Sequence, residues 1–439
     1  RDSVDVTVFV QDQWSIIPET DFNLASPNLI IKDKNFLGLG TSIRQDFAYY
    51  SSDNSSLIEG EYGIFNIRKS FLSTNLIYRS AKDLSYVGVQ FDRPFFSPLT
   101  KWAGGLSYIR KSTFFHPFED TAQILRSFPL LYDEFDVWAA KSWQFEHGKT
   151  IEKRSTSFVA GLRLFQSNYR KRPNWEIDSF YQNSDQILLL SSIGTTRRQF
   201  YKEKYLYRFG ANEDVPIGFS FQLIGGGQQI EFQNLQYYTG ASAAVGWYRK
   251  MVGYIALNLS YGNFHTKADL NRGVIRLNVN SFSNLVRYEK WAFRQFATFN
   301  TVIGLNREAY EFIDLNGSQM YGFNSDVLKG QSKAILNLET IFYTPYNVFG
   351  FRLAPVLLVS LGKIGYTFNQ LSNSRIYQAY SVGLLVRNDN LVFQTFELSI
   401  GIYPYLPGGN EAYVLNPVRS YRLRVRDFAI TRPESLKYD

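Results

Sequence analysis

The fold is decided by the stretch from Asp314 to Tyr366, which reads DLNGSQMYGFNSDVLKGQSKAILNLETIFYTPYNVFGFRLAPVLLVSLGKIGY. It begins as a polar loop with turn residues and then passes into two runs that alternate in polarity. In the first run, Leu336 and Leu338 fall on the face opposite Glu339. This two-residue period predicts a strand with a different solvent on each face. The second run, from Phe351 to Gly362, is more apolar and ends in a turn.

Alternating runs of the same kind follow one another from Phe36 to residue 430, and none has helical periodicity. We predict that their apolar faces form an outward band that includes Ile255, Leu257, Leu259, Leu336, Leu338, Leu398, Ile400 and Ile402. The opposite face carries polar residues such as Asn258, Asn337 and Glu397. A soluble half-buried sandwich would also alternate, but it would be expected to have shorter strands and fewer exposed aromatic residues.

The composition agrees with a membrane barrel. Aromatic residues make up 17% of the 439 residues, only 20% are charged, and the mean hydropathy is −0.22. Alternation between a greasy outer face and a polar inner face averages the hydropathy to near zero. No window approaches the ~18 consecutive apolar residues that a membrane helix needs. A membrane protein with this sequence must therefore be a closed barrel, since helices and closed sheets alone satisfy all backbone groups in hydrocarbon.

The net charge of +8 raises the question of an anionic partner. The basic residues are spread along the chain, and no nucleic-acid-reading module is recognisable, so we expect no nucleic acid partner. A basic lumen and contacts with anionic lipid head groups are the preferred explanation. The chain has no cysteine, which excludes disulfides and thiolate metal sites.

Several weak motifs, taken in their order along the chain, resemble the BamA/TamA superfamily of outer-membrane assembly and translocation barrels of the surface-antigen type. The family has a first barrel strand, a long inward lid loop with a hydrophobic-Arg-Gly-aromatic tip, a strand with a glutamate, and a strand that ends in an aromatic-x-Asp-x-Gly motif. Residues 4–14 (VDVTVFVQDQW) look like the last strand of a periplasmic POTRA domain, and residues 35–40 (NFLGLG) look like the first barrel strand. Met320, Gly322 and Phe323 match the tip of the lid loop. Glu339 matches the glutamate, Gly362 matches the last glycine of the motif, and residues 383–388 (GLLVRN) look like the third-from-last strand.

The resemblance implies an all-β fold, namely a transmembrane antiparallel β-barrel of about 16 strands with an inward-folded lid loop. Residues 1–33 would be the end of a POTRA-like segment and its connection, and residues 34–439 would be the barrel. It also implies a Gram-negative outer-membrane location and a role in inserting outer-membrane proteins or translocating polymers. The partners would be outer-membrane lipids, including lipopolysaccharide, and client or complex-partner envelope proteins.

Two positions depart from the family pattern in a correlated way. Tyr321 stands where the family has arginine at the tip, and Ser360 stands where it has aspartate. Losing only one of the two charges would leave the other unpaired inside the barrel. We therefore predict that residues 307–331 still fold into the lumen through a neutral latch. The lid-loop tip would be Met320, Tyr321, Gly322 and Phe323, and the latch positions would be Glu339, Ser360 and Gly362.

The last alternating run suggests how the barrel closes. Tyr421, Leu423 and Val425 alternate with a basic ladder of Arg422, Arg424 and Arg426. An arginine on the lipid face at the bilayer midplane costs ~2–4 kcal/mol, so the ladder is predicted to face the lumen. The resemblance implies a seam between this strand and the strand that starts near Phe36.

The sequence offers little that could support catalysis. His116, His147 and His265 are far apart, and none is paired with a second metal ligand at helical spacing. We therefore predict no catalytic residue, no metal site and no cofactor. A passive porin-like channel or a non-catalytic structural subunit of an envelope complex remains the main alternative, and a barrel enzyme that acts on lipid is a weaker one.

Overall fold

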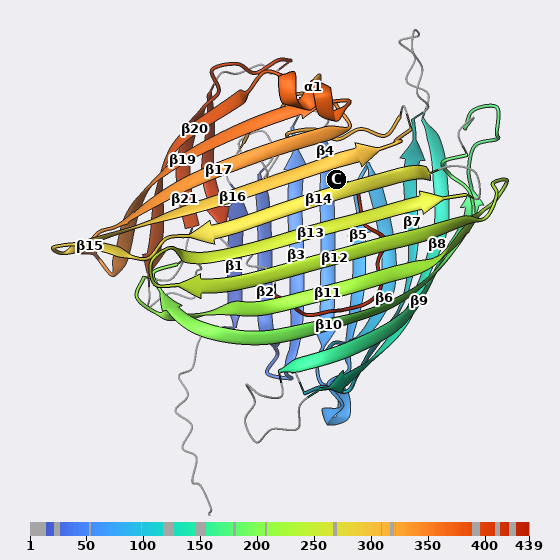
Figure 1. Ribbon diagram of the computed structural model, residues 1–439, viewed down its shortest axis with the longest axis horizontal. Coiled ribbons are helices and arrows are strands. Elements are labelled where there is room, and N and C mark those ends of the chain that lie inside the picture. The colour runs from blue at the N-terminus through green and yellow to red at the C-terminus, as the bar shows by residue number, and fades with distance from the viewer. Residues whose placement is uncertain are drawn as a thin grey trace, which may run out of the picture.

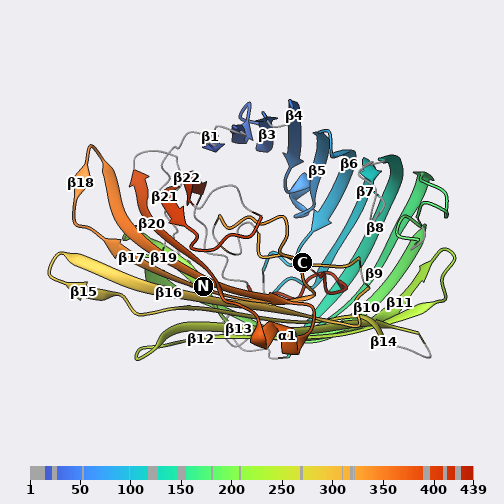
Figure 2. The same ribbon diagram turned by 90° about the horizontal axis from the view of Figure 1, so that it is seen from above.

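A computed structural model shows one large sheet that curls into a barrel around a wide interior (Figures 1 and 2). The structure describes residues 15–21, 27–51, 54–97, 99–116, 127–145, 155–178, 181–206, 209–266, 270–308, 310–316, 320, 322–388, 396–408, 413–420 and 427–438. Within these ranges the sheet has 22 strands, and every pair of hydrogen-bonded strands is antiparallel. This pattern confirms the all-β antiparallel barrel.

The strands of the barrel are as follows: β1 Ile16–Asp21, β2 Asn28–Phe36, β3 Thr41–Tyr50, β4 Ser55–Ile64, β5 Ser73–Ser80, β6 Leu84–Arg93, β7 Trp102–Phe115, β8 Phe128–Gln144, β9 Thr156–Lys171, β10 Gln186–Lys204, β11 Asn212–Ile230, β12 Gln236–Arg249, β13 Gly253–His265, β14 Leu270–Phe282, β15 Val286–Tyr288, β16 Trp291–Leu305, β17 Ser332–Tyr343, β18 Asn347–Val348, β19 Phe351–Gly365, β20 Tyr377–Asn388, β21 Phe396–Ile402 and β22 Tyr413–Ser420. The 3-10 helix η1 spans Ile67–Lys69, and the helix α1 spans Phe368–Asn373.

The prediction of about 16 strands is too low. The short strands β15 and β18 continue β14 and β17 at hairpin ends, which leaves 20 wall strands among the 22 in the described ranges. The count of about 16 followed from the resemblance, and single-sequence patterns place strand boundaries too poorly to correct it.

The start of the barrel also needs correction. Both β1 and β2 belong to the same sheet, because β1 pairs with β2 and β2 pairs with β3. Among the described residues the wall therefore includes Ile16 onward, which lies before residue 34. The NFLGLG segment ends β2 and forms the turn to β3, so it is not the first barrel strand. Residues 1–14, where the POTRA-like strand was expected, lie outside the described ranges. Residues 383–388 do lie in the third-from-last strand, β20.

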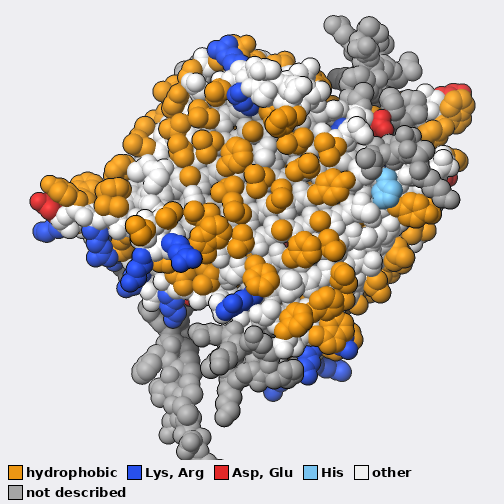
Figure 3. Space-filling model, viewed as in Figure 1, with side chains coloured by type: hydrophobic (Ala, Val, Ile, Leu, Met, Phe, Trp, Pro, Cys, Tyr) orange, Lys and Arg blue, Asp and Glu red, His pale blue; other side chains and the backbone are white. Residues whose placement is uncertain are grey.

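The alternation predicted from the sequence matches the two faces of the wall. In β13, Leu259 is 51% exposed, and its neighbour Ser260 is buried. In β21, Ile400 is 59% exposed, whereas Glu397 is fully buried. Figure 3 shows hydrophobic side chains spread over the outer face, with Lys and Arg gathered along one edge. The outward apolar band is confirmed where its residues are described.

The wall differs in strand length around the barrel. The strands β2 to β6, called the short side, have 8–10 residues each. The strands β7 to β14, called the long side, have 13–19 residues each. At a rise of about 3.3 Å per residue, the longest strands measure about twice the length of the short ones. The views in Figures 1 and 2 place the two sides opposite each other.

The first and last strands meet at a seam. Their Cα atoms approach within 8 Å, but the described residues form no ladder between β1 and β22. The seam thus lies between β1 and β22. The strand near Phe36, which was expected to form one edge of it, is not at the seam. The last strand, β22, is described as far as Ser420. The predicted basic ladder of Arg422, Arg424 and Arg426 lies outside the described residues.

Two ends of the barrel can be distinguished from the alternating strand directions. We call the end where β1 begins and β22 ends the terminal end, and the opposite one the lid end. The lid end carries the β16–β17 connection and α1. The helix α1 is capped by Thr367, whose side chain accepts a hydrogen bond from the Gln370 N–H. No helix in the described part of the chain is long and apolar enough to cross a membrane.

Candidate functional site

Three inward segments lie against the inner face of the barrel. The lid loop comprises residues 306–331 between β16 and β17, and the inner loop comprises residues 205–211 between β10 and β11. The third segment, which we call the strap, comprises residues 427–438 after β22. Together they bring side chains from distant parts of the sequence into the lumen.

The tip of the lid loop packs on the inner wall at the lid end. Met320 and Phe323 are fully buried in one cluster with inward side chains of β17, β19 and β20 and with Tyr403, which directly follows β21. The Phe323 ring meets Tyr377 and Tyr403 edge-on, with ring centroids 6.0 Å away in both cases. A Cβ atom at Gly362 would lie only 2.8 Å from Met320 Sδ, so a larger residue there would displace the methionine side chain.

The lid loop is also closed by polar contacts of its own. The Asn316 side chain donates to the Ser325 carbonyl at 3.1 Å and accepts from the Ser325 N–H at 2.8 Å. Ile313 and Gly330 form an isolated bridge near the base of the loop. The Ser325 hydroxyl donates to the Pro407 carbonyl, which ties the loop to the β21–β22 connection.

The predicted latch residues lie on neighbouring strands. Glu339 is on β17, whereas Ser360 and Gly362 are on β19, and all three point inward. Met320 touches the wall at Gly362, so the described part of the tip lies beside one predicted latch position. Tyr321 lies outside the described residues, and its predicted contact stays a prediction.

The inner loop fills the lumen nearer the terminal end. Leu206 and Phe209 belong to the largest buried cluster of the molecule's described part, together with inward residues of β13 to β20. The Tyr343 hydroxyl donates to the Leu206 carbonyl at 2.8 Å, and Arg352 donates to the Phe209 carbonyl at 2.9 Å. Buried Arg294 lies 3.3 Å from Glu203 at the end of β10.

Charged side chains fix the strap to the long side. Arg198 on β10 pairs with Asp427. Asp136 on β8 accepts from Arg163 at 2.8 Å and from Arg432 of the strap at 3.0 Å. Partly buried, bidentate Arg–carboxylate pairs of this kind are stronger than exposed ones.

Two apolar side chains of the strap enter places that glycines leave open. Phe428 is 2% exposed, and a Cβ atom at Gly246 would collide with its ring. Ile430 is 4% exposed, and a Cβ atom at Gly194 would lie 2.7 Å from its Cδ1 atom. The wall glycines thus leave two shallow hollows that receive Phe428 and Ile430.

The wall also binds the backbone of the strap. Thr196 donates to the Phe428 carbonyl at 2.5 Å, and Arg276 donates to the Lys437 carbonyl at 2.8 Å. Arg163 donates to the Pro433 carbonyl at 3.2 Å. In the opposite sense, the Leu436 N–H donates to the Tyr238 hydroxyl at 2.8 Å.

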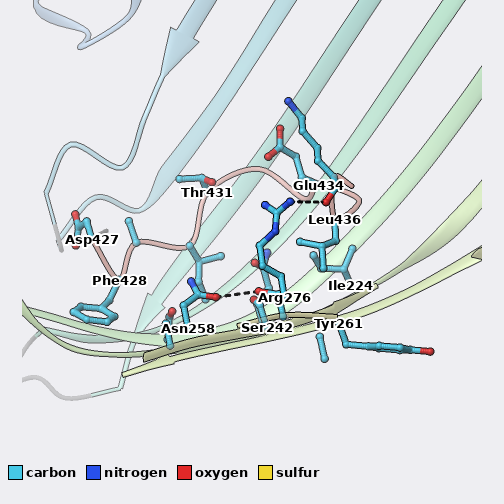
Figure 4. A pocket seen from close by; sticks show the side chains of 18 of the residues that line it. Ile224, Ser242, Asn258, Tyr261, Arg276, Asp427, Phe428, Thr431, Glu434 and Leu436 are labelled. Atoms are coloured by element: carbon cyan, nitrogen blue, oxygen red, sulfur yellow. Dashed lines mark hydrogen bonds between the residues drawn. The ribbon is translucent and has the colours of Figure 1, made fainter. Parts of the chain in front are cut away.

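A polar cavity of about 290 Å³ lies between the strap and strands β11 to β14. Figure 4 shows Asp427, Thr431 and Glu434 on the strap side and Ser242, Asn258 and Arg276 on the wall side. The cavity therefore presents hydroxyl, amide and charged groups of both signs. It lies beside the hollows and the side-chain donors described above.

The strap ends on the lid loop. The Tyr438 hydroxyl donates to the Gln331 carbonyl at 2.8 Å. The Arg307 guanidinium lies 3.9 Å from the centroid of the Tyr438 ring and pairs with Glu311 at 2.6 Å. Burial lowers the pKa of Arg307, and the nearby Glu311 carboxylate opposes this effect. The two inward segments are thus physically connected.

Another ion pair links two connections at the lid end of the long side, the one after β9 and the one after β11. Arg172 follows β9, and its Nη1 lies 2.6 Å from Glu231 Oε2 in the β11–β12 turn. The hydrogen bond from Arg172 holds the pKa of the Glu231 carboxyl below its usual range. The Asp185 N–H also donates to Glu231, at 3.4 Å.

The lumen is not simply basic, contrary to the expectation from net charge. On the short side, Arg44 pairs with Asp46, and Arg79 lies 3.6 Å from Glu59. The Tyr86 hydroxyl donates to Glu59 at 2.5 Å. Inward charges of both signs therefore neutralise one another on this part of the wall.

An outward cluster carries positive charge at the lid end. Arg110 on β7 and Arg170 on β9 share the carboxylate of Asp133 on β8. The arginine side chains are about half exposed, whereas Asp133 is buried. Asp136 on the same strand faces inward, because it pairs with Arg432 of the strap. Odd-numbered residues in this part of β8, such as Asp133, therefore face outward. Two guanidinium groups on one carboxylate leave a net positive charge at the outer rim.

The sequence pattern did not reveal the strap. The alternating run was expected to continue to residue 430, but residues 427–430 are not a strand. Residues 421–426 lie outside the described ranges. Pro433 signals no strand in the second half of the strap, because proline cannot donate to a ladder. Sequence spacing alone could not show which strap residues Arg163 and Asp136 would contact.

No family model and no curated protein matches this sequence. Among solved structures, the chain is similar to BamA from Haemophilus ducreyi lacking POTRA domains 1–3, with 10% sequence identity and a TM-score of 0.44. The similarity covers 88% of this chain and 70% of that chain. It is also similar to CdiB from Acinetobacter baumannii, with 9% identity, 90% of this chain and 60% of that chain covered, and a TM-score of 0.39. Scores this low do not support a conclusion about activity.

Proposed function

We propose that this chain is a Gram-negative outer-membrane barrel that assists the insertion of outer-membrane proteins or the passage of polymers across that membrane. The seam is the observation that supports this proposal. The described residues of β1 and β22 are each hydrogen-bonded to one neighbouring strand but not to each other. Free backbone donors and acceptors at such edges are what an incoming strand requires.

This work needs no cofactor and no covalent chemistry, because an incoming strand only exchanges backbone hydrogen bonds at the seam. The partners would be client polypeptides, other envelope proteins and outer-membrane lipids. The outward cluster of Arg110, Asp133 and Arg170 supports contact with anionic lipid, including lipopolysaccharide, since a net positive charge lies at the rim of an apolar wall. Residues 1–14 would be the end of a POTRA domain.

A crosslink across the seam tests the proposal. The chain has no cysteine, so one cysteine in β1 and one in β22 can be scanned for disulfide formation without background. Crosslinked protein should fail to restore outer-membrane protein levels in cells depleted of the native chain, and reduction should restore them. A matched disulfide between Ser281 and Ala297, cross-strand neighbours on β14 and β16, should leave function intact. Full activity of the seam-crosslinked protein would refute an opening seam.

The alternative is a structural subunit or a passive channel. Tyr321 and Ser360, which replace the charged pair of the family pattern, favour a structural subunit. The inward lid loop, inner loop and strap weigh against an open channel. Unchanged outer-membrane protein levels after depletion would favour the structural role, and steady single-channel conductance in a planar bilayer would favour the passive channel.

A further inference from the structure

Part of what holds the strap is its backbone, which any polypeptide carries. Three wall side chains, Thr196, Arg163 and Arg276, donate to strap carbonyl groups, and Tyr238 accepts from a strap N–H. These bonds do not depend on the strap's side chains. A different segment in an extended conformation would present the same carbonyl and N–H groups.

The side-chain contacts of the strap add a simple pattern. Phe428 and Ile430 are two residues apart, and both are buried in hollows at wall glycines. Side chains at positions i and i+2 share one face of an extended chain. The pattern of a large apolar residue at every second position is also that of a strand of a membrane barrel.

We infer that the inner face of β8 to β14 is a binding site for extended polypeptide segments with large apolar residues at i and i+2, and that the strap is its intramolecular occupant. This inference rests on the proposed function, because it names where a client segment would bind inside the barrel. The wall supplies side-chain donors for backbone carbonyl groups, two apolar hollows, and Arg198 for an acidic residue before the first hollow. The adjacent polar cavity of about 290 Å³ leaves room for side chains of varied size.

Binding at this site competes with the strap. The strap is tethered to β22, so its local concentration is high, in the millimolar range for short flexible tethers. A free segment gains access when the strap loosens. Its end on the lid loop, at Gln331 and Arg307, means that movement of the lid loop would also weaken the strap.

The test uses the full chain in detergent micelles and a fluorescent peptide with the strap sequence DFAITRPESLKY, residues 427–438. A Cβ atom at Gly262 would lie 2.8 Å from Leu436 Cβ, which is closer than the ~3.8 Å that a disulfide needs. One cysteine at Leu436 and one at the nearby wall residue Ser260, which lines the same cavity, are therefore introduced and tested for disulfide formation. In the oxidised protein the strap is fixed at both ends. The peptide should bind at least ~10-fold more weakly to the oxidised than to the reduced form of the same molecule.

A second variant changes only the occupant. In the full-length F428A/I430A chain, the strap loses both apolar anchors, while every wall group stays in place. The peptide should bind this variant at least ~10-fold more tightly than the unaltered chain. A control peptide with serine in place of its Phe and Ile should lose most of this binding.

Equal peptide binding by the oxidised and reduced forms would overturn the inference, and so would equal binding of the serine control peptide. The measurement needs no assembly activity. A failure here together with a positive seam test would reject the binding site and keep the proposed function. Peptide binding together with full activity of the seam-crosslinked protein would keep the binding site and reject the proposed function.

Discussion

The long side and the short side of this barrel enclose the same lumen but give their inward residues different surroundings. On the long side, the strap and inner loop cover the wall, and Tyr254 is fully buried with its hydroxyl 2.8 Å from the Pro216 carbonyl. On the short side, Tyr86 is only partly buried and donates to Glu59. An inward position therefore behaves as protein core on one side and as a lumen surface on the other.

This difference bears on how the molecule could work. The seam adjoins the short side, where strands of 8–10 residues barely match a hydrocarbon thickness of about 30 Å. The long side has more backbone pairing and a packed interior. We therefore expect the short side to open first and the long side to remain as a rigid support.

The strongest test of the comparison replaces the same residue type on both sides. Tyr254→Ala should lower the free energy of unfolding by about 3–5 kcal/mol, because it removes a buried ring that stacks on Phe282 at 5.0 Å. Tyr86→Ala should cost about 1 kcal/mol, since mainly one hydrogen bond is lost. Urea titration of the barrel refolded into lipid vesicles measures both values. Equal losses would show that the two inward surfaces do not differ.

A somewhat smaller effect is expected on the outer face. Leu259→Arg should destabilise the barrel by about 2–4 kcal/mol if this exposed residue lies near the bilayer midplane. Asn258→Arg, at the adjacent inward position, is the matched control and should cost clearly less, because it meets the polar cavity. The same urea titration compares them. A larger loss at Asn258 would reverse the assignment of the two faces.

The smallest effect concerns bilayer thickness. Lipids with longer chains should speed amide hydrogen exchange in β2 to β6, because mismatch costs fractions of a kcal/mol per Å. Exchange in β10 and β11, with 19 residues each, should change little. Hydrogen exchange followed by mass spectrometry resolves these segments. Equal acceleration on both sides would mean that strand length does not decide where the barrel yields.

The sequence also predicted part of the candidate site. It pointed to Met320 and Phe323 as a lid tip and to Gly362 on the facing wall, and the structure places Met320 beside Gly362. It did not reveal the inner loop, whose apolar residues Leu206 and Phe209 follow β10 without any distinctive pattern. Their burial depends on a wall built from strands far along the chain.

By itself, the sequence determined that the chain alternates between two faces, that the outer face is apolar, and that Leu259 and Ile400 belong to it. This is a local property, since successive side chains of a strand point to opposite sides. The tertiary structure alone decided the number of wall strands, the short and long sides, and the path of the strap. Arg198 and Asp427, for example, are 229 residues apart and meet only because the sheet curls and the chain turns back inside it. No periodicity records such a contact, because it depends on barrel curvature and strand register summed over the whole wall.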